Sequence, residues 1–472
     1  MATTTTDHPL LIAGERVQTG EWTDVRSPYS GDVVGRVAKG GAAEARRALD
    51  AAARALESPI PAHERARILD ATARLLEERQ EEAARIISSE AGKPMKAARV
   101  EAQRAVSTFT FAAVEARKLA GEIVPMDASV AGAGKLAFTL RLPIGIVGAI
   151  SPFNFPLNLV AHKVAPALAA GCPVVLKPAS ATPLSALFLA GLEAEAGLPP
   201  GWLNVVAGSA SQIGDALVDD ERVKLITFTG SGDVGWGLAE RAHRKRVKLE
   251  LGNATPAIVC ADAPEDTAGK LAANAFSFAG QSCISVQRVF VLAEAWDEFV
   301  AQFVPKVEAL VVGDPGDDET DVGPVISGDD RDRILDWIRE SKGEVLAGGE
   351  TTGEGLIRPT VIANPAPQDK VQCEEVFGPV VTLTKVSSLD DAIERANATR
   401  YGLQAAIFSR DVKACLTAAH RLEFGGVTVN EAPTFRADQM PYGGVKASGN
   451  TKEGPAWAVH EMTEERLVVL QL

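Results

Sequence analysis

The sequence contains few cysteines and histidines, and neither kind is grouped. Its five cysteines are scattered over 472 residues without a Cys-x-x-Cys pair, and its six histidines form no metal-ligand spacing with each other or with the cysteines. This pattern argues against a disulfide framework and a zinc site, so we expect a reducing, cytoplasmic location and no bound metal. Because a lone cysteine is usually a small buried hydrophobe, a chemical role for any of them needs separate evidence.

Long apolar runs and an excess of positive charge are also missing. No stretch approaches the roughly 20 apolar residues that span a membrane, so we expect no membrane anchor. The N-terminal MATTTTDHPLLIAGERV has no basic leader followed by an apolar run, so we expect no secretory signal. The net charge is −14, from 48 Lys and Arg against 62 Asp and Glu. Such a chain repels nucleic acid and anionic membrane surfaces, and we expect neither as a partner.

The chain is too long for one hydrophobic core, because single cores stop growing at about 250–300 residues. Three helical patterns come first, at residues 42–56, 66–91 and 95–119, before weak strands at 123–142. From Gly145 onward, continuous Val/Ile/Leu runs alternate with helical runs, and a second such series follows Pro256. This alternation indicates parallel sheets covered on both faces. We therefore predict an α/β fold with two parallel α/β domains, joined near residues 251–255.

The last residues, RLVVLQL, have the pattern of an apolar strand with nothing after it to pair with. An exposed apolar edge promotes aggregation. We therefore expect this strand to pair either with another segment of the chain or with another subunit.

Two segments carry side chains that suit chemistry. Cys283 lies in Gly280-Gln281-Ser282-Cys283-Ile284, between a helical and a strand pattern, where reactive groups are commoner than inside elements. Its alternative role is that of a buried thiol. Glu250 lies at the end of an apolar strand, so its carboxylate is exposed on one face, paired, or shifted in pKa. A base that activates water needs such a shift, whereas a solvated surface glutamate does not.

Three further segments carry polar or glycine-rich patterns. Asn154, between Pro152 and Pro156, suits an oxyanion donor or a helix cap. Residues 228–235 are glycine-rich, follow a strand and open a helix, so their amides suit a pyrophosphate, although G-x-G-x-x-G is absent. The acids in Glu374-Glu375-Val376-Phe377-Gly378-Pro379 either hold ribose hydroxyls or are simply solvated.

In this order, the segments resemble the aldehyde dehydrogenase superfamily, over nearly the whole chain. Further matching motifs are Pro143-Ile144-Gly145, Leu176-Lys177-Pro178, Gly425-Gly426-Val427-Thr428-Val429-Asn430 and Pro441-Tyr442-Gly443-Gly444-Val445-Lys446. The resemblance implies a cofactor-binding domain, a catalytic domain and a small bridging sheet used for oligomerisation. We place these at 1–121 with 142–251, at 252–445, and at 122–141 with 446–472, respectively. We also expect a homodimer or a homotetramer.

The family pattern then implies a role for each matched residue. Cys283 is similar to the family's nucleophile, Glu250 to its general base and Asn154 to its oxyanion donor. Lys177 resembles the ligand of the adenosine ribose, and Glu375 that of the nicotinamide ribose. The full set expected to contact NAD or NADP is Ile150, Ser151, Pro152, Phe153, Lys177, Ser180, Gly208, Gly230, Ser231, Gly235, Leu251, Glu375 and Phe377.

The implied reaction is the oxidation of an aldehyde to a carboxylate. A thiohemiacetal and then a thioester form on Cys283, and water activated by Glu250 hydrolyses the thioester. One alternative is a CoA-acylating semialdehyde dehydrogenase, which does not need the water-activating glutamate. Another is a catalytically silent homologue. The presence of Glu250 disfavours the first, and the intact set of Cys283, Glu250 and Asn154 disfavours the second.

The run Cys283-Ile284-Ser285-Val286-Gln287-Arg288 resembles the subgroup that acts on lactaldehyde and related small hydroxy- or semialdehydes. We therefore expect a small-molecule aldehyde as substrate. The residues expected to contact it are Arg104, Phe155, Ser282, Ile284 and Arg436. The two arginines either anchor an anion, which arginine binds in bidentate fashion, or make structural salt bridges.

The sequence departs from the family pattern at three places. Asn253 stands where a second glycine usually follows the base, and Asn450-Thr451 replaces a glycine after Ser448-Gly449. Both changes are expected to affect loops near the substrate tunnel or a subunit contact. Ser180 stands where many NAD-specific members have an acid, which leaves the preference between NAD and NADP open.

Overall fold

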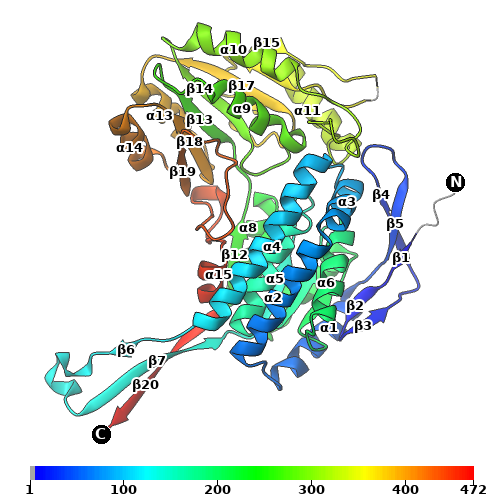
Figure 1. The fold of residues 1–472 in the computed structure, drawn as a ribbon, viewed down its shortest axis with the longest axis vertical. Coiled ribbons are helices and arrows are strands. Elements are labelled where there is room, and N and C mark those ends of the chain that lie inside the picture. Colours follow the sequence, from blue (N-terminus) through cyan, green and yellow to red (C-terminus); the bar gives the residue numbers. More distant parts are fainter. Residues whose placement is uncertain (1–5, 354) are drawn as a thin grey trace.

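The computed structural model describes residues 6–353 and 355–472, which form two α/β units and a projecting arm (Figure 1). The first unit is built on a seven-stranded sheet with the order β12-β11-β8-β9-β10-β2-β3. The five strands from β12 to β10 run parallel, and β2 and β3 add antiparallel strands at one edge. The strands are β2 (Leu10–Ile12), β3 (Glu15–Val17), β8 (Ile146–Ile150), β9 (Val174–Lys177), β10 (Leu203–Val205), β11 (Val223–Thr229) and β12 (Arg246–Glu250).

Helices cover both faces of this sheet, which explains why its parallel strands are apolar throughout. One face carries α1 (Ala42–Leu56), α7 (Ala210–Asp219) and α8 (Gly232–Arg241). The other face carries α5 (Asn158–Ala170) and α6 (Leu184–Glu195), with α2 (Ala62–Glu78), α3 (Gln80–Ala91) and α4 (Met95–Lys118) packed over them. Every residue of α5 is buried, as expected for a helix enclosed by neighbours on all sides.

The single helix predicted over 66–91 is in fact two helices, α2 and α3. Arg79 separates them and has a non-helical backbone, with φ −112° and ψ 25°. The six residues from Glu77 to Glu82 are all polar, so no apolar side chain anchors this turn to the core. The break therefore lies where the helical pattern has no buried position to maintain it.

The second unit has its own seven-stranded sheet, with the order β15-β16-β17-β14-β13-β18-β19. All of its pairs are parallel except β15 with β16. Its strands are β13 (Thr255–Val259), β14 (Val286–Leu292), β15 (Glu344–Ala347), β16 (Thr360–Ala363), β17 (Val380–Val386), β18 (Gln404–Phe408) and β19 (Gly426–Val429). One face packs on α9 (Thr267–Phe276), α10 (Trp296–Glu308), α11 (Gly328–Glu340) and α12 (Lys370–Cys373), the other on α13 (Leu389–Asn397) and α14 (Val412–Arg421). The predicted α/β fold with two parallel sheets is thus confirmed.

Two small sheets complete the fold. The first, in the order β1-β5-β4, lies beside the first unit and consists of β1 (Asp7–His8), β4 (Trp22–Arg26) and β5 (Val33–Ala38). The second forms the arm that projects from the body in Figure 1, with β6 (Ile123–Val124), β7 (Lys135–Pro143) and β20 (Thr463–Gln471). β20 pairs antiparallel with β7 over its whole length, so the C-terminal strand does pair within the chain. The short helices η4 (Lys446–Ser448) and α15 (Pro455–Glu461) come before β20 in the sequence. α15 packs on α4 and α5.

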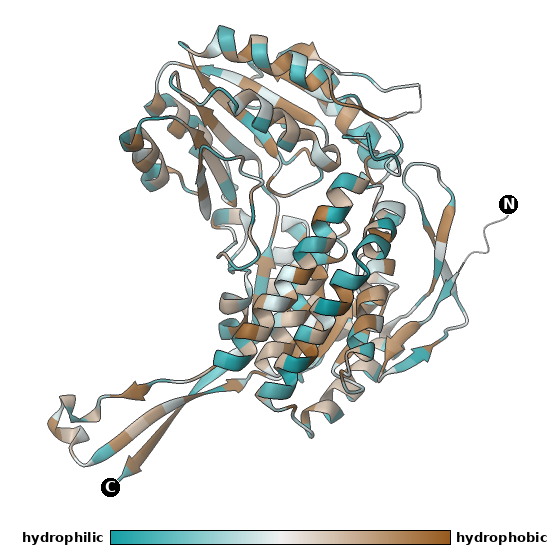
Figure 2. Cartoon of the chain, in the orientation of Figure 1, coloured by the Kyte–Doolittle hydropathy of each residue, from teal (hydrophilic) through white to brown (hydrophobic). Residues whose placement is uncertain are grey.

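The arm leaves apolar side chains exposed. β20 is the edge strand of the order β20-β7-β6, and Figure 2 shows hydrophobic residues along it and along β7. Leu467 is 57% exposed and Val469 46%. Within the described residues, every helix is too short or too polar to cross a membrane.

The strand registers bring the predicted site residues to two facing edges. Ile150 is paired with Lys177 and with Phe228, and Thr229 is paired with Glu250, so these lie at the carboxyl edge of the first sheet. In the second sheet, the pairing of Thr255 with Val286 aligns the starts of β13 and β14. The loop with Cys283 precedes β14, and Cys283 lines one cavity with the residues at the carboxyl edge of the first sheet, where open α/β sheets bind ligands.

Candidate active site

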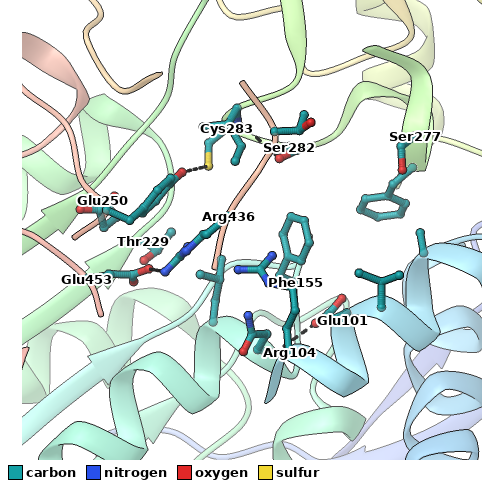
Figure 3. A pocket seen from close by; sticks show the side chains of 18 of the residues that line it. Glu101, Arg104, Phe155, Thr229, Glu250, Ser277, Ser282, Cys283, Arg436 and Glu453 are labelled. Atoms are coloured by element: carbon teal, nitrogen blue, oxygen red, sulfur yellow. Dashed lines mark hydrogen bonds and ion pairs between the residues drawn. The ribbon is translucent and has the colours of Figure 1, made fainter. Parts of the chain in front are cut away.

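Two cavities meet at Cys283. The first is lined by Arg104, Phe155 and Arg436 among others, and the second by residues from the carboxyl edge of the first sheet. Both are lined by Leu159, Thr229, Glu250, Leu251 and Cys283. Figure 3 shows the first cavity, with Cys283 and Arg104 on opposite sides of the view and Arg436 between them. A group bound in either cavity would therefore reach the same sulfur atom.

A tight left-handed turn precedes Cys283. Phe278, Ala279 and Gly280 have φ values of 51°, 52° and 70° in succession. A Cβ atom at Gly280 would lie 2.1 Å from the carbonyl oxygen of Gly378, so only glycine fits at this position. Gln281 then fixes the loop, because its side chain donates to the Pro324 carbonyl and accepts from the Ile326 amide. Strain of this kind is found where a functional side chain must be held in one place.

The surroundings of Cys283 raise the pKa of its thiol to about 12. Burial is the largest cause, the hydroxyl of Tyr442 lowers the pKa, and the charges of Glu375 and Glu250 raise it. The Tyr442 oxygen lies 3.0 Å from the Cys283 sulfur. Because a thiolate is the nucleophilic form of cysteine, this hydrogen bond acts against the effect of burial.

Glu250 is a buried carboxylate that lacks hydrogen bonds. Across residues 6–353 and 355–472, neither of its oxygens has a hydrogen-bond partner, and the residue is only 4% exposed. Burial, followed by the negative charge of Glu453, raises the pKa of Glu250 well above its ordinary value. A carboxylate whose pKa is raised in this way is suited to take a proton from water near neutral pH.

Asn154 is held rigidly beside the catalytic loop. Its side-chain amide donates to the Gln281 carbonyl at 3.0 Å, and its own carbonyl accepts from the Lys93 ammonium at 2.7 Å. Lys93 is buried, forms an ion pair with Glu101 and lies 3.8 Å from the centre of the Phe155 ring. Asn154 does not cap α5, because Glu101 accepts the amides at the start of that helix.

The second cavity gathers most of the predicted cofactor residues. Its lining includes Ile150, Ser151, Pro152, Phe153, Lys177, Ser180, Gly230, Ser231, Leu251, Glu375 and Phe377. Gly208 and Gly235 are not in this lining. Gly208 lines a neighbouring hollow with Ser180, and a Cβ at Gly235 would lie 2.5 Å from the Leu251 side chain, so α8 approaches Leu251 too closely for a side chain at this position.

Two charged groups in this cavity have unused hydrogen-bonding capacity. The Lys177 ammonium is largely buried, which lowers its pKa, and it has no hydrogen-bond partner within the described chain. Burial raises the pKa of Glu375 to about 7, while the Asn253 amide donates to one of its oxygens at 2.9 Å. The ten-residue helix α8 begins beside them at Gly232, after Ser231. A free cation, a free carboxylate oxygen and a helix N-terminus fit the ribose hydroxyls and phosphates of a dinucleotide.

All five residues expected to contact the substrate line the first cavity, namely Arg104, Phe155, Ser282, Ile284 and Arg436. Both arginines are also in ion pairs, Arg104 with Asp438 at 2.9 Å and Arg436 with Glu453 at 2.8 Å. In the described structure, the Nε atom of each arginine is buried and has no partner. The arginines therefore make salt bridges and also line the cavity.

The two asparagines that depart from the family pattern line neither cavity but hydrogen-bond to strands next to the site. The Asn253 side chain donates to Thr255 and to the Gln404 carbonyl, between the starts of β13 and β18. The Asn450 side chain accepts from the Leu249 amide and donates to the Val247 carbonyl. Asn450 therefore hydrogen-bonds along β12, the strand that ends in Glu250.

Tyr442, Glu453 and Lys163 are among the residues at or near the site that were given no role from the sequence. Tyr442 and Glu453 line the first cavity and precede α15, and Lys163 lies on α5. Lys163 donates to Thr229 at 2.6 Å and lies 3.7 Å from Glu453. Burial alone would raise the pKa of Glu453, but the charges of Arg436 and Lys163 outweigh it and bring the pKa to about 2. Tyr442 did lie in a matched motif, whereas no local pattern marks the other two.

The fold and the site define an NAD(P)-dependent aldehyde dehydrogenase. The model of the aldehyde dehydrogenase family matches residues 16–468, and the chain belongs to this family. The 3-sulfolactaldehyde dehydrogenase of Priestia aryabhattai is 42% identical over 98% of this chain and 98% of its own. The lactaldehyde dehydrogenase of Methanocaldococcus jannaschii is 38% identical over 96% of this chain and 99% of its own.

The chain is also similar to a solved structure of an aldehyde-oxidising enzyme. The NADP-dependent glyceraldehyde-3-phosphate dehydrogenase of Bacillus halodurans, crystallised with NADP, is 38% identical, with a TM-score of 0.95 over 99% of both chains. The similarity to the subgroup of lactaldehyde and small-aldehyde dehydrogenases, expected from the sequence, is thereby confirmed.

Proposed function

We propose that the protein oxidises a small hydroxy- or semialdehyde carrying a distal anionic group to the carboxylate, with hydrolysis of a Cys283 thioester. The cofactor is NAD or NADP. The observation that carries the proposal is the junction of two cavities at Cys283, one lined by Arg104 and Arg436 and the other by Lys177 and Glu375. Glu250 lines both cavities at this junction, where a hydrolytic water must be activated.

The reaction follows from the side chains at the junction. The Cys283 thiolate attacks the aldehyde carbon and forms a thiohemiacetal alkoxide, to which the Asn154 amide and the Cys283 amide donate hydrogen bonds. A nicotinamide held beside Glu375 and Phe377 would supply the acceptor for the hydride that leaves the aldehyde carbon. Cys283 then holds the acyl group as a thioester, and Glu250 takes a proton from the water that attacks it. The acid leaves and the thiol is restored.

The dinucleotide would be held by groups at both ends of the second cavity. Lys177 and Ser180, which line this cavity, would hold the adenosine ribose, and Glu375 with Phe377 the nicotinamide ribose. The phosphates would lie at Ser231 and the start of α8, where amide donors and the helix dipole favour negative charge.

The anionic group of the substrate is assigned to Arg104 and Arg436. Sulfolactaldehyde and glyceraldehyde 3-phosphate, named for two of the related enzymes, carry a sulfonate and a phosphate. Comparison of kcat/KM for 3-sulfolactaldehyde, succinate semialdehyde and lactaldehyde tests this assignment. We expect the two anionic aldehydes to be preferred at least about tenfold, and Arg104→Met to remove that preference. Equal values for uncharged lactaldehyde would contradict it.

The CoA-acylating alternative is tested in the same assay. Release of the free acid without CoA, at a rate that added CoA does not change, is expected because Glu250 is placed to activate water. Formation of acyl-CoA as the product would overturn the hydrolytic assignment.

We expect Asn154→Ala to lower kcat by about 10²–10³-fold, the usual loss for one oxyanion donor. The amide is held by Gln281 beside the cysteine loop, so its second N–H is free for the alkoxide. Steady-state kinetics of the variant provide the measurement. Asn397→Ala, which removes a half-buried asparagine bonded to Arg421 and Glu423, is the matched control. An unchanged kcat in Asn154→Ala would leave this residue with a structural role only.

We expect NADP to be accepted with a kcat/KM within about tenfold of that for NAD, a difference of ~1.4 kcal/mol. An acid at position 180 would repel a 2′-phosphate, since like charges at ~4 Å cost about 4 kcal/mol at an effective dielectric near 20. Ser180 is exposed beside the cavity, donates to the Gly208 carbonyl at 3.3 Å and carries no charge. Ser180→Glu should shift the preference toward NAD. A native preference for NAD above a hundredfold would show that another group excludes the phosphate.

We further propose how the chain divides into domains and how the subunits assemble. Residues 1–121 and 142–251 bind the cofactor, residues 252–445 form the catalytic domain, and 122–141 with 446–472 serve the bridge. The exposed apolar residues of β7 and β20 suit burial against another subunit, in a homodimer or homotetramer of a cytoplasmic enzyme. Light scattering on the purified protein measures this assembly, and a monomer would contradict it.

A further inference from the structure

Tyr442 touches the sulfur atom of the nucleophile. Its hydroxyl oxygen lies 3.0 Å from the Cys283 sulfur, and Figure 3 marks an interaction that ends on this sulfur. The two residues are 159 positions apart in the sequence. Tyr442 is 3% exposed and lines the first cavity. In the part of the chain that the structure describes, its hydroxyl has no other hydrogen-bond partner.

The tyrosine ring is fixed from two sides. Its backbone forms a short antiparallel bridge with Glu453, with hydrogen bonds in both directions. The Arg436 guanidinium lies 3.9 Å from the centre of its ring, and is itself held by the ion pair with Glu453. Ile284 and Leu403 pack against the ring with Cys283. The hydroxyl is therefore directed at the sulfur by the surrounding structure and not by the hydrogen bond alone.

The direction of this hydrogen bond changes when the thiol ionises. With a thiol, either atom can be the donor, but a thiolate has no proton, so the tyrosine must donate. Burial, followed by the charge of Cys283, raises the pKa of Tyr442 well above its ordinary value, so the phenol keeps its proton. The guanidinium below the ring is a buried cation, and a cation on the ring face strengthens the phenol as a donor.

The other charged groups that face Cys283 act in opposite directions. Glu375 and Glu250 both disfavour a negative sulfur, and Arg436 favours it. Asn154 is directed at the Gln281 carbonyl in this structure, and no described side chain other than Tyr442 has a hydrogen bond with the Cys283 sulfur. Tyr442 is thus the one group placed to donate to the thiolate before an aldehyde arrives.

We propose that Tyr442 is a catalytic residue, whose hydroxyl donates a hydrogen bond to the Cys283 thiolate and directs the sulfur into the substrate cavity. The tyrosine neither gains nor loses a proton in this role, and the thiol proton equilibrates with solvent. The proposal deepens the proposed function, because it rests on Cys283 as the nucleophile. Its test, however, needs neither aldehyde nor cofactor.

The experiment is alkylation of Cys283 by iodoacetamide, followed by mass spectrometry of its peptide over a range of pH. Only the thiolate reacts, so below the midpoint of the profile the rate is proportional to the thiolate fraction. Loss of a hydrogen bond to a charged atom corresponds to a shift of about one to two pH units. We therefore expect Tyr442→Phe to slow alkylation by about 10–100-fold at neutral pH, with an unchanged melting temperature.

Two controls separate this role from packing. Tyr29→Phe removes a hydroxyl from the loop between β4 and β5, far along the chain from the site, and should leave the rate unchanged. Cys373, a partly exposed thiol in the same molecule, should react at the same rate in all variants.

A further variant tests the opposite direction. Tyr442→3,5-difluorotyrosine keeps the hydroxyl and makes it a stronger donor, so it should speed alkylation of Cys283 at the same pH.

An unchanged alkylation profile in Tyr442→Phe overturns the proposal, whatever the enzymatic activity of the variant. If Tyr442→Phe does not fold, the difluorotyrosine protein decides, and equal rates with the native protein overturn the proposal. Failure of the proposed function is a separate result, because the native enzyme would then oxidise no aldehyde although the alkylation rates still differ.

Discussion

Replacement of Cys283 by alanine is expected to abolish aldehyde oxidation while cofactor binding remains intact. The reaction needs a sulfur that forms a covalent bond to the aldehyde carbon, and a methyl group cannot form it. Loss of an essential nucleophile lowers kcat by about 10⁴-fold or more. Absorbance of the reduced cofactor during turnover measures the loss, and fluorescence titration with NADP measures the retained binding.

Retained binding is expected because the groups that would hold the dinucleotide lie elsewhere in the second cavity. Lys177 ends β9, and Glu375 precedes β17, so neither depends on the Cys283 side chain for its position. Cys373→Ala is the control, because it removes a partly exposed thiol that lines neither of the cavities that meet at Cys283. Dehydrogenase turnover in Cys283→Ala at a rate near that of the native protein would refute the thioester mechanism.

The sequence predicts well those helices and strands whose formation depends on residues within the segment itself. The helix predicted over 42–56 has the same bounds as α1 in the structure. This segment is rich in alanine, which favours helix, and its buried residues recur at helical spacing. The continuous apolar runs became parallel strands, because strands covered on both faces have no polar side. The break at Arg79 was missed because a helical pattern does not show which turn lacks a buried anchor.

A site residue can be predicted only where one short segment of the sequence contains the complete motif. Cys283, Glu250 and Asn154 lie in short motifs at element ends, and the structure brings all three to the lining of the joined cavities. The cap of α5 was open between Asn154 and other groups, and Glu101 provides it from 56 residues away. Such a contact depends on how α4 packs against α5, which no local pattern contains.

Lys163 and Glu453 had no predicted role because their contacts also depend on the packing of distant segments. Lys163 lies inside a helix that is buried all round, where a lysine has no sequence signal beyond its own identity. Glu453 lies in a loop near the C-terminus, and their proximity of 3.7 Å arises only when that loop packs on α5. The arginines show the converse. Anion binding and structural salt bridges were the alternatives from the sequence. The structure contains the salt bridges and also brings both arginines to the cavity lining.

Replacement of Glu250 by glutamine is expected to permit one burst of reduced cofactor but little steady turnover. Formation of the thioester needs no water, whereas its hydrolysis does. A glutamine has nearly the shape of glutamate but cannot accept a proton, so the acyl group should remain on Cys283. Stopped-flow absorbance measures the burst, which should approach one reduced cofactor per active site, and mass spectrometry of the quenched protein should detect the acylated cysteine.

The control for this variant is Glu193→Gln. Glu193, on α6, is also a buried carboxylate without hydrogen-bond partners in the described structure, and burial raises its pKa to about 8, but it lines neither cavity. It should keep native turnover, because it is a buried carboxylate that lies away from the two cavities. If Glu250→Gln shows no burst although it is folded and binds cofactor, Glu250 acts before the thioester forms, as the base that ionises the thiol. The two outcomes differ in the first turnover, so a single experiment on the millisecond scale distinguishes hydrolysis from thiol activation.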